Sequence, residues 1–274
     1  MTAIHTSKQY LLALILMTAL SMAVEAEPSS QVLPTLWYDS AGDQLYKVSD
    51  NRLFKSKTST IDWQEIEIPF GLTGSELTSI VTSTENAQSV YVAGLGLGVW
   101  RRSDEGNAWE SLDGDLPSKD IMALAIHRDQ PETLYVVLVQ DGIYRTQNAG
   151  KTWTKMDSGP VKPILRLMHS NMEGSMETGW LYAVSDDAVR ISMDCFCGWR
   201  LTGIMNIGAV YDTVFDPQNP TQVYAATDTG IWSSSNGGQE WELGSDAVSI
   251  AIAFVPSLGL VGLDSSGSVS RYID

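Results

Sequence analysis

Short apolar strands recur along the chain, and no apolar stripe of helical spacing interrupts them. A segment with tyrosine between apolar residues occurs five times, as LYKV, VYVA, LYVV, LYAV and VYAA. A polar turn and a second short strand follow each one, as in VWRR (99–102) and IYRT (143–146). Short apolar segments bounded by Gly, Asp and Ser clusters are typical of β-strands. The pattern predicts an all-β protein built from hairpins.

Five tryptophans define the period of a repeat. They are Trp63, Trp109, Trp153, Trp199 and Trp241, spaced by 46, 44, 46 and 42 residues. One more apolar strand precedes each tyrosine segment, so each unit contains four short strands with the tryptophan strand outermost. A unit of about 40 residues cannot bury both faces of its own sheet, so successive units must pack together. We predict a β-propeller of four-stranded antiparallel sheets.

The two ends of the repeat determine the number of blades. Residues 247–274 contain three strands of a further unit without a tryptophan. Residues 33–39 either begin the first unit or close the ring by adding an outer strand to the last one, which would remove exposed strand edges. Five complete units and one partial unit favour six blades. Five blades with a swapped closing sheet and seven with a degenerate one are the alternatives.

Residues 1–26 have the pattern of a secretory signal peptide. Lys8 precedes the apolar run 11–24, and VEA (24–26) places small residues at the cleavage positions. That run has 14 residues, whereas a helix needs about 20 to span a bilayer core. An uncleaved membrane anchor is the alternative. We expect residues 27–274 to form a single propeller domain that is exported, either periplasmic or secreted, with no membrane span after signal removal.

The charge of the chain limits its partners. Lys and Arg number 17 and Asp and Glu 33, so the formal net charge is −16. Nucleic acids and anionic membranes need a basic face, and neither is an expected partner. The charge favours solubility or cationic partners.

The two cysteines, Cys195 and Cys197, are one residue apart. This spacing differs from the C-x-x-C of redox catalysts. An exported chain would permit oxidation, but a bridge across one residue is strained. We expect a loop pair that is either idle or oxidised.

The turn before each tryptophan points to a family. YRTQNAGKTWTKM (144–156) and WSSSNGGQEWELG (232–244) share the pattern Ser/Thr-x-Asp/Asn-x-Gly-x-x-Trp. This pattern closely resembles the Asp-box, or BNR repeat, of sialidases, sortilin-type receptors and exported bacterial propellers. Two units match it fully, through Thr146, Asn148, Gly150 and Trp153 and through Ser234, Asn236, Gly238 and Trp241. Partial matches are Asp104, Gly106 and Trp109 in the second unit, Ser192, Asp194 and Trp199 in the fourth, and Ser56 and Trp63 in the first.

The resemblance implies a structural role for these turns. An Asp or Asn side chain binds backbone N–H groups of the turn, glycine takes the positive φ, and tryptophan packs back as an apolar plug. The turns then lie on the outer hairpins, away from the propeller axis.

A sialidase-like activity would require an arginine cluster, a tyrosine paired with a glutamate, and an aspartate. Arg128 and Arg166 are the only arginines near inner strands, too few for an arginine triad. More usual glycosidases need paired carboxylates, and the sequence singles out no pair. We predict no catalytic residue and no cofactor.

Histidine offers one possible metal ligand set. His127 and His169 end inner strands of two different units and would meet at the channel mouth, with Asp129 as a third ligand. Ordinary surface histidines are the favoured alternative, and no metal site is predicted.

The turn between the second and third strands carries an acid in nearly every unit. These residues are Asp50, Asp141, Asp186, Asp187, Asp228 and Asp264. Symmetry would place them on the face opposite the tryptophan turns. Connections between units would add Asp113, Asp115, Asp120, Asp157 and Asp246 to the same face. Together they would form an acidic rim that attracts basic partners, although plain hairpin chemistry explains each acid singly.

The favoured function is a non-catalytic scaffold that binds a protein partner in the cell envelope through this acidic rim. It is similar to exported BNR-repeat proteins, some of which resemble the photosystem II assembly-factor propeller, although the basic face of that factor is not matched. The alternative is a carbohydrate-active propeller, glycan-binding or hydrolytic. Its sugar platforms would be Trp37, Tyr38, Trp180 and Tyr211.

Overall fold

Twenty-three strands make up the described part of the computed structural model, which covers residues 32–68, 71–83, 89–103, 108–175 and 179–273. Val32–Asp274 forms one compact unit. No helix occurs in these ranges, so nothing described there has the length and hydropathy of a transmembrane helix. The predicted signal peptide, 1–26, and the turn residues Asp104 and Gly106 lie outside the described residues.

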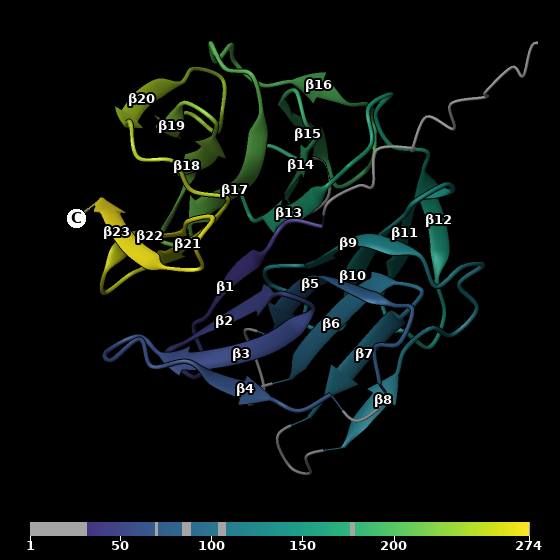
Figure 1. Cartoon of the computed structure of the whole chain (residues 1–274). Helices are drawn as coiled ribbons and strands as arrows, with labels where there is room; N and C mark the ends of the chain where they lie inside the picture. Colours follow the sequence, from purple (N-terminus) through teal and green to yellow (C-terminus); the bar gives the residue numbers. More distant parts are fainter. Residues whose placement is uncertain (1–31, 69–70, 84–88, 104–107, 176–178, 274) are drawn as a thin grey trace, which may run out of the picture. The chain divides into compact units, whose positions relative to one another are not determined.

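The strands form six antiparallel sheets, each continuous in sequence (Figure 1). Blade 1 contains β1 (Thr35–Asp39), β2 (Gln44–Ser49), β3 (Arg52–Lys57) and β4 (Gln64–Ile66). Blade 2 contains β5 (Glu76–Thr82), β6 (Val90–Leu95), β7 (Gly98–Arg102) and β8 (Trp109–Ser111). Blade 3 contains β9 (Ile121–Ile126), β10 (Leu134–Leu138), β11 (Gly142–Thr146) and β12 (Thr154–Asp157).

The second half of the chain continues the same order. Blade 4 contains β13 (Arg166–Ser170), β14 (Trp180–Val184), β15 (Val189–Met193) and β16 (Arg200–Leu201). Blade 5 contains β17 (Val210–Asp216), β18 (Asn219–Thr227), β19 (Gly230–Ser234) and β20 (Glu242–Ser245). Blade 6 contains β21 (Ala251–Val255), β22 (Gly259–Leu263) and β23 (Val269–Ile273).

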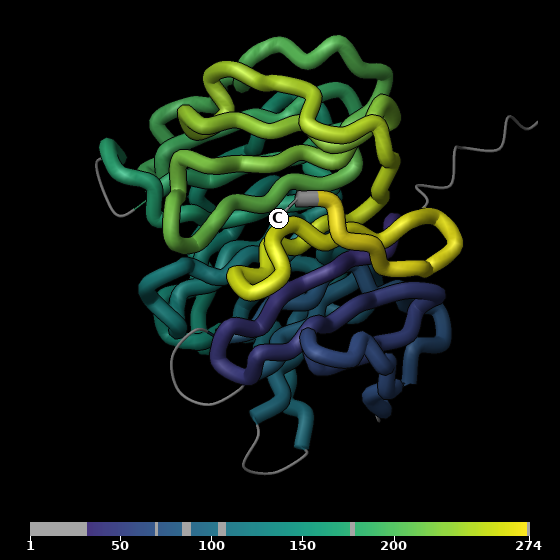
Figure 2. The backbone as a smooth tube through the Cα atoms, turned by 90° about the vertical axis from the view of Figure 1, so that its left-hand side faces the viewer, coloured from purple at the N-terminus to yellow at the C-terminus, as the bar shows by residue number. Residues whose placement is uncertain are grey.

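The predicted all-β, six-bladed propeller is confirmed. The inner strands β1, β5, β9, β13, β17 and β21 neighbour one another in a ring, and β21 lies beside β1 (Figure 2). Of the two alternatives for residues 33–39, the structure adopts the first, because β1 is the inner strand of blade 1. Blade 6 has three described strands, so the ring closes by contact between its first and last blades and not by a shared sheet.

Polar side chains link the inner strands of neighbouring blades. Thr35 Oγ1 donates to the carbonyl of Thr78, whose own Oγ1 donates to Ile121 O. On the next level, Leu124 N donates to Ser79 Oγ. Apolar side chains such as Leu134, with no exposed surface, fill the seams outside this ring. Hydrophobic burial therefore holds the blades together, and the polar contacts set their register.

The tryptophan turns, 146–153 and 234–241, have the internal bonds expected of their residue types. Thr146 Oγ1 accepts from the N–H groups of Asn148 and Gly150, and Asn148 Oδ1 accepts from Thr152 N. Ser234 and Asn236 repeat these bonds in blade 5. Each turn also contacts the blade before it, because Gly238 O accepts from Gly203 N. These turns join successive blades at the periphery.

Candidate functional site

A cavity of about 280 Å³ lies on the propeller axis, enclosed by the six inner strands. These strands run in the same direction, since each one starts its blade. Residues at the start of the strands, Arg166 and Asp212 among them, are buried, whereas Ser40, Gln218 and Pro256, just beyond the strand ends, are exposed. The axial cavity therefore opens at the strand ends and is closed at the strand starts.

A buried arginine, Arg166, closes the axial cavity at the strand starts. Arg166 donates from Nη2 to the carbonyls of Leu33, at 2.7 Å, and Pro34, at 2.8 Å. Asp212 accepts from the N–H groups of Thr213 and Ile252, both at 2.9 Å. Burial raises the pKa of Asp212 to about 6 although the charge of Arg166 opposes the shift, and burial lowers the pKa of Arg166. The hydrogen bonds of both side chains therefore join inner-strand segments of different blades at the closed end of the cavity.

The open end is aromatic and carries one arginine. Trp37, Tyr38 and Phe254 line it together with Arg128. Burial lowers the pKa of Arg128, and Asp129 opposes that shift. Burial also raises the pKa of Tyr38 to about 12, with a further contribution from Asp43. A partly desolvated cation among aromatic faces suits a ligand with both an apolar body and an acceptor group.

Two of the four predicted sugar platforms lie in the cavity. Trp37 and Tyr38 line it. Trp180 is buried in blade 4 with the Arg200 guanidinium 4.8 Å from its ring centroid. Tyr211 packs against a separate apolar cluster between blades 5 and 6. The tryptophan period could not distinguish these cases, because it does not report which face of a strand a side chain occupies.

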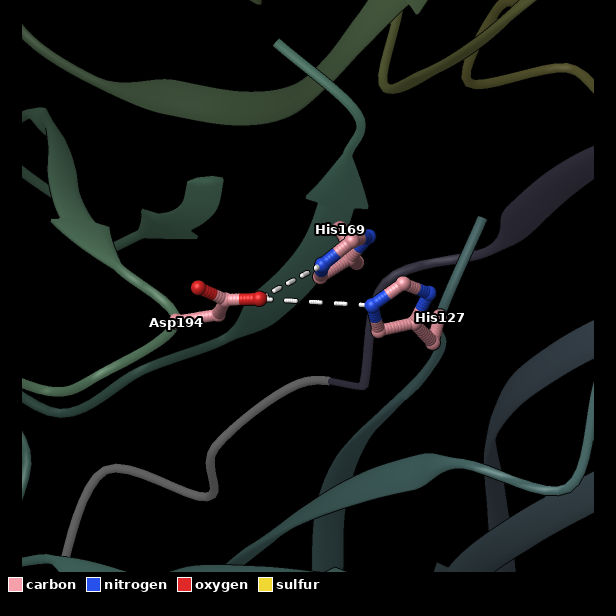
Figure 3. A group of neighbouring side chains, drawn as sticks. All are labelled: His127, His169 and Asp194. Atoms are coloured by element: carbon pink, nitrogen blue, oxygen red, sulfur yellow. Dashed lines mark ion pairs between the residues drawn. The ribbon is translucent and has the colours of Figure 1, made fainter. Parts of the chain in front are cut away.

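Three buried side chains meet where blade 3 contacts blade 4, beside the cavity (Figure 3). His127 follows β9, His169 lies in β13, and Asp194 follows β15. Asp194 Oδ2 is 3.5 Å from His169 Nε2 and 4.0 Å from His127 Nε2. The two imidazole rings stack with centroids 3.9 Å apart. His169 also lines the axial cavity.

The expectation of surface histidines is wrong, although the two histidines do meet. Their exposed fractions are 1% for His127 and 3% for His169. The carboxylate near both is Asp194, whereas the expected third residue, Asp129, supplies its backbone N–H to His127 Nδ1. The sequence signal for Asp194 is the departure of the fourth tryptophan turn from the repeat: Phe196 stands where Gly106, Gly150 and Gly238 stand in other units, and cysteines flank it.

The tryptophan turn of blade 4 differs structurally from the turns 146–153 and 234–241. Cys195 and Cys197 form a disulfide, which matches the oxidised alternative. Phe196 has a φ of 56°, and its ring packs 6.1 Å from that of Tyr135 in blade 3. The turn thereby directs the carboxylate of Asp194 toward the histidines.

Hydrogen bonds define the protonation of the histidines. His127 Nδ1 accepts from Asp129 N and His169 Nδ1 accepts from Arg128 N, both at 3.1 Å. Each neutral ring therefore carries its proton on Nε2, the atom that faces Asp194. Burial lowers the pKa of His127 to about 4, a shift that His169 reinforces and Asp194 opposes.

The same three side chains could in principle hold a metal ion, since their ligand atoms lie within 4.8 Å of one another. A ligating imidazole needs its Nε2 lone pair free and its Nδ1–H donating to an acceptor. Here both Nδ1 atoms face N–H donors, so each Nε2 carries the proton and has no lone pair to offer a metal ion. The arrangement fits a proton-holding cluster better than a preformed metal centre.

The six acids of the predicted rim do lie at the turns between second and third strands. Three form ion pairs: Asp141 with Lys155, Asp186 with Lys162, and Asp187 with Arg190. The other three bind neutral groups of their surroundings: Asp50 accepts from Ser49 Oγ, Asp228 from Gly208 N, and Asp264 from Ser266 N and Ser268 N.

The connections between blades contribute less to this face than expected. Asp115 accepts from Trp153 N at 2.7 Å, and Asp157 accepts from Trp199 Nε1 at 2.8 Å. Both carboxylates thus contact the tryptophan turn of the following blade. These two acids therefore bind groups of the following blade, while Asp157 also pairs with Ile143 beside the acidic turn of its own blade.

Comparison with known proteins supports the fold. No protein-family model and no curated protein matches the chain. Among solved structures, the GH74 enzyme of Niastella koreensis is 14% identical with a TM-score of 0.59, over 88% of this chain and 44% of that one. The GH74 xyloglucanase from Xanthomonas campestris is 18% identical with a TM-score of 0.57, over 87% and 43%. YCF48 bound to D1 peptide is 15% identical with a TM-score of 0.59, over 89% and 94%.

These similarities establish the class of protein, a β-propeller. The chain spans less than half the length of the two GH74 enzymes but nearly the whole of the YCF48 chain. At such identities the likeness concerns the fold alone.

Proposed function

We propose that this protein is a non-catalytic binding propeller that holds an extended peptide segment of a protein partner at the open end of the axial cavity. The observation that carries the proposal is the lining of the cavity, to which Trp37, Tyr38, Phe254 and Arg128 all contribute. Aromatic faces bury apolar side chains of a peptide, and the guanidinium binds its carbonyl or carboxylate oxygens. A propeller of similar fold and length is bound to a peptide, which agrees with this choice.

A glycan is the second candidate, because two propellers of similar fold are GH74 enzymes. The lining argues against it. Most of the cavity surface is apolar, through residues such as Leu124, Ile126 and Phe215, which suits the apolar side chains of a peptide better than sugar hydroxyls. Hydrolysis needs two carboxyl groups beside the scissile bond. Among the described residues that line the cavity, Asp212 is the one carboxylate, and backbone N–H groups occupy it.

A peptide-display selection and a glycan array, both on the purified protein, test the proposal. Peptides selected on the wild type should lose at least tenfold in affinity with Arg128→Gln. The matched control is Arg190→Gln, which removes a cation paired with Asp187 on the opposite face and should leave affinity unchanged. If the protein binds particular glycans and Arg128→Gln abolishes that binding, the ligand of the cavity is a sugar and not a peptide. Binding unaffected by Arg128→Gln would remove the cavity from consideration.

The acidic rim remains a proposed second docking surface for basic partners. Three of its acids already form ion pairs within the protein, so we expect the rim to steer association and not to provide most of the affinity. The variant Asp141→Asn/Asp186→Asn/Asp187→Asn/Asp228→Asn should slow association of a basic peptide at low salt and have no effect at high salt. Equal association rates of the wild type and the variant at low salt would show that the acidic rim does not steer basic partners.

We also propose that the protein is exported. This proposal rests on the signal-peptide pattern of residues 1–26 and would locate the protein and its partner in the cell envelope or outside the cell. Cell fractionation with N-terminal sequencing tests it, and recovery in the cytosol with residues 1–26 intact would reject it.

A further inference from the structure

We propose that His127, His169 and Asp194 form a proton-operated link between blades 3 and 4, which holds the seam closed when both imidazoles are neutral and opens it when they are protonated. The two histidines come from neighbouring inner-strand segments, and Asp194 comes from the outer hairpin of blade 4 (Figure 3). The link therefore spans the seam from the cavity wall outward.

The neutral state accounts for the contacts of both Nδ1 atoms, while the Nε2 atoms lie 3.5 Å (His169) and 4.0 Å (His127) from Asp194 Oδ2, longer than a normal hydrogen bond. Each Nδ1 accepts a backbone N–H, from Asp129 to His127 and from Arg128 to His169, so each remaining proton on Nε2 faces Asp194. The stacked rings at 3.9 Å carry no net charge in this state. Two neutral imidazoles beside one carboxylate are compatible with burial.

The doubly protonated state of either ring conflicts with these contacts. A second proton on either ring would stand on Nδ1 and point at a backbone N–H, so that two donors oppose each other. Two charged rings would also repel each other across 3.9 Å, and among the described residues Asp194 is the carboxylate grouped with them. The low pKa of His127, about 4, agrees with this resistance to protonation.

Within the described part of the chain, the groups packed around the two rings do little to offset an added positive charge. Arg145 of β11 adds positive charge near His127 and lowers its pKa further. The Tyr135 ring of β10 stacks on His169 at 5.7 Å between centroids. The loop after β9 brings Arg128 and Asp129, whose backbone N–H groups already bind the rings. On the remaining side, a Cβ at Gly179 would lie 2.9 Å from His169 Nε2, so the backbone there is too close to admit water.

Nuclear magnetic resonance of the wild-type protein provides the first test. Long-range ¹H–¹⁵N spectra at pH 7.5 should show both buried histidines as the Nε2–H tautomer, and adding Zn²⁺ should change neither. An Nδ1–H tautomer in either ring, or a zinc-dependent shift of its Nε2 resonance, would overturn the proposal in favour of a metal site. The measurement needs no variant and no peptide ligand, so its outcome is independent of the proposed binding function.

Hydrogen exchange followed by mass spectrometry provides the second test. With labelling times corrected for intrinsic exchange, residues 121–127 and 166–170 should lose at least tenfold protection between pH 7.5 and pH 4.0. The seam between blades 1 and 2, residues 35–39 and 77–82, has no histidine and should keep its protection. Equal loss at both seams, or no loss at either, would refute the link.

Substitutions sharpen the second test. His127→Gln/His169→Gln should remove the difference between the two seams. Asp129→Asn is the matched control, since it keeps the backbone donor to His127 and changes only an exposed carboxylate, and it should behave like the wild type. A pH response that survives the double substitution would refute the link. If that variant does not fold, the wild-type comparison of the two seams still decides.

Discussion

Trp153 Nε1 donates a 2.9 Å hydrogen bond to the carbonyl oxygen of Leu112, which ties the tryptophan turn of blade 3 to the end of blade 2. One blade further on, Trp199 Nε1 donates to the Asp157 carboxylate instead. Trp241 is equally buried, but its Nε1 has no hydrogen-bond partner in the described structure. The same residue at the same repeat position therefore contributes differently at each seam.

Trp153→Phe should destabilise the protein by about 1–2 kcal/mol beyond the loss of ring area, because Leu112 O would lose its donor inside the protein. Trp241→Phe makes the same change where no bond exists and should cost clearly less. Guanidinium unfolding at neutral pH measures both free energies. Equal losses would mean that the bond across the seam has no net effect on stability.

Gly150 takes a φ of +82°, and a Cβ there would lie 2.6 Å from Leu112 Cβ. Gly150→Ala should therefore cost both the strain of positive φ, about 1 kcal/mol, and a clash across the seam, in total about 3 kcal/mol. Gly267 has a φ of +83° with nothing within 4 Å, so Gly267→Ala should cost the strain alone. Urea unfolding separates the two contributions, and a similar loss at both positions would show that the turn relaxes away from blade 2.

Arg166 and Asp212 are opposite charges buried at the closed end of the cavity. Removing Arg166 leaves the Asp212 carboxylate uncompensated, so Arg166→Met should cost about 3–5 kcal/mol at neutral pH. Asp212→Asn should cost less, because a neutral amide avoids the burial penalty that raises the pKa of Asp212. The double variant should cost at least 1 kcal/mol less than the sum of the two. A double-mutant cycle by chemical unfolding tests this, and strict additivity would show that the two charges do not interact.

His127 and Asp212 should give opposite slopes of stability against pH. The pKa of His127 is about 4 in the folded protein, below the 6.5 of a free histidine, so folding stability falls by about 3 kcal/mol as the pH drops from 6.5 to 4. The pKa of Asp212 is about 6, above the 3.8 of a free aspartate, so its contribution is fully present below 3.8 and about 3 kcal/mol is lost as the pH rises through 6.

The two effects should largely cancel in the wild type between pH 4 and 6. His127→Gln should expose the Asp212 slope, with stability rising toward low pH, and Asp212→Asn should expose the opposite His127 slope. Unfolding curves at half-unit pH steps measure both. Parallel curves for the two variants would contradict the assignment.

The sequence was sufficient to predict the strands of each blade and the turns between them. The spacing of Trp153 and its counterparts reports the length of one unit, because a four-stranded sheet with two exposed faces is stable only against its neighbours. The turn chemistry of Thr146, Asn148 and Gly150 is local and follows from residue type. The position of the acidic turns was also predictable, since hairpins require particular residues at fixed places.

Contacts between units were not predictable in the same way. Arg166 closes the cavity by reaching Leu33 and Pro34, residues 133 and 132 positions away in the chain. His127, His169 and Asp194 belong to two blades and three separate segments, and their approach depends on how blades 3 and 4 pack. The pairing of Asp186 with Lys162 likewise depends on the path of the connection into blade 4.

The sequence by itself thus determined the fold class, the blade number and the turn residues, because hydrophobic periodicity and turn preferences act over a few neighbouring residues. The tertiary structure alone decided which end of the axial cavity is open, that β1 begins blade 1, and that two histidines share one aspartate. The physical reason is that those features arise from packing between sheets, where burial and charge are set by residues far apart in the chain.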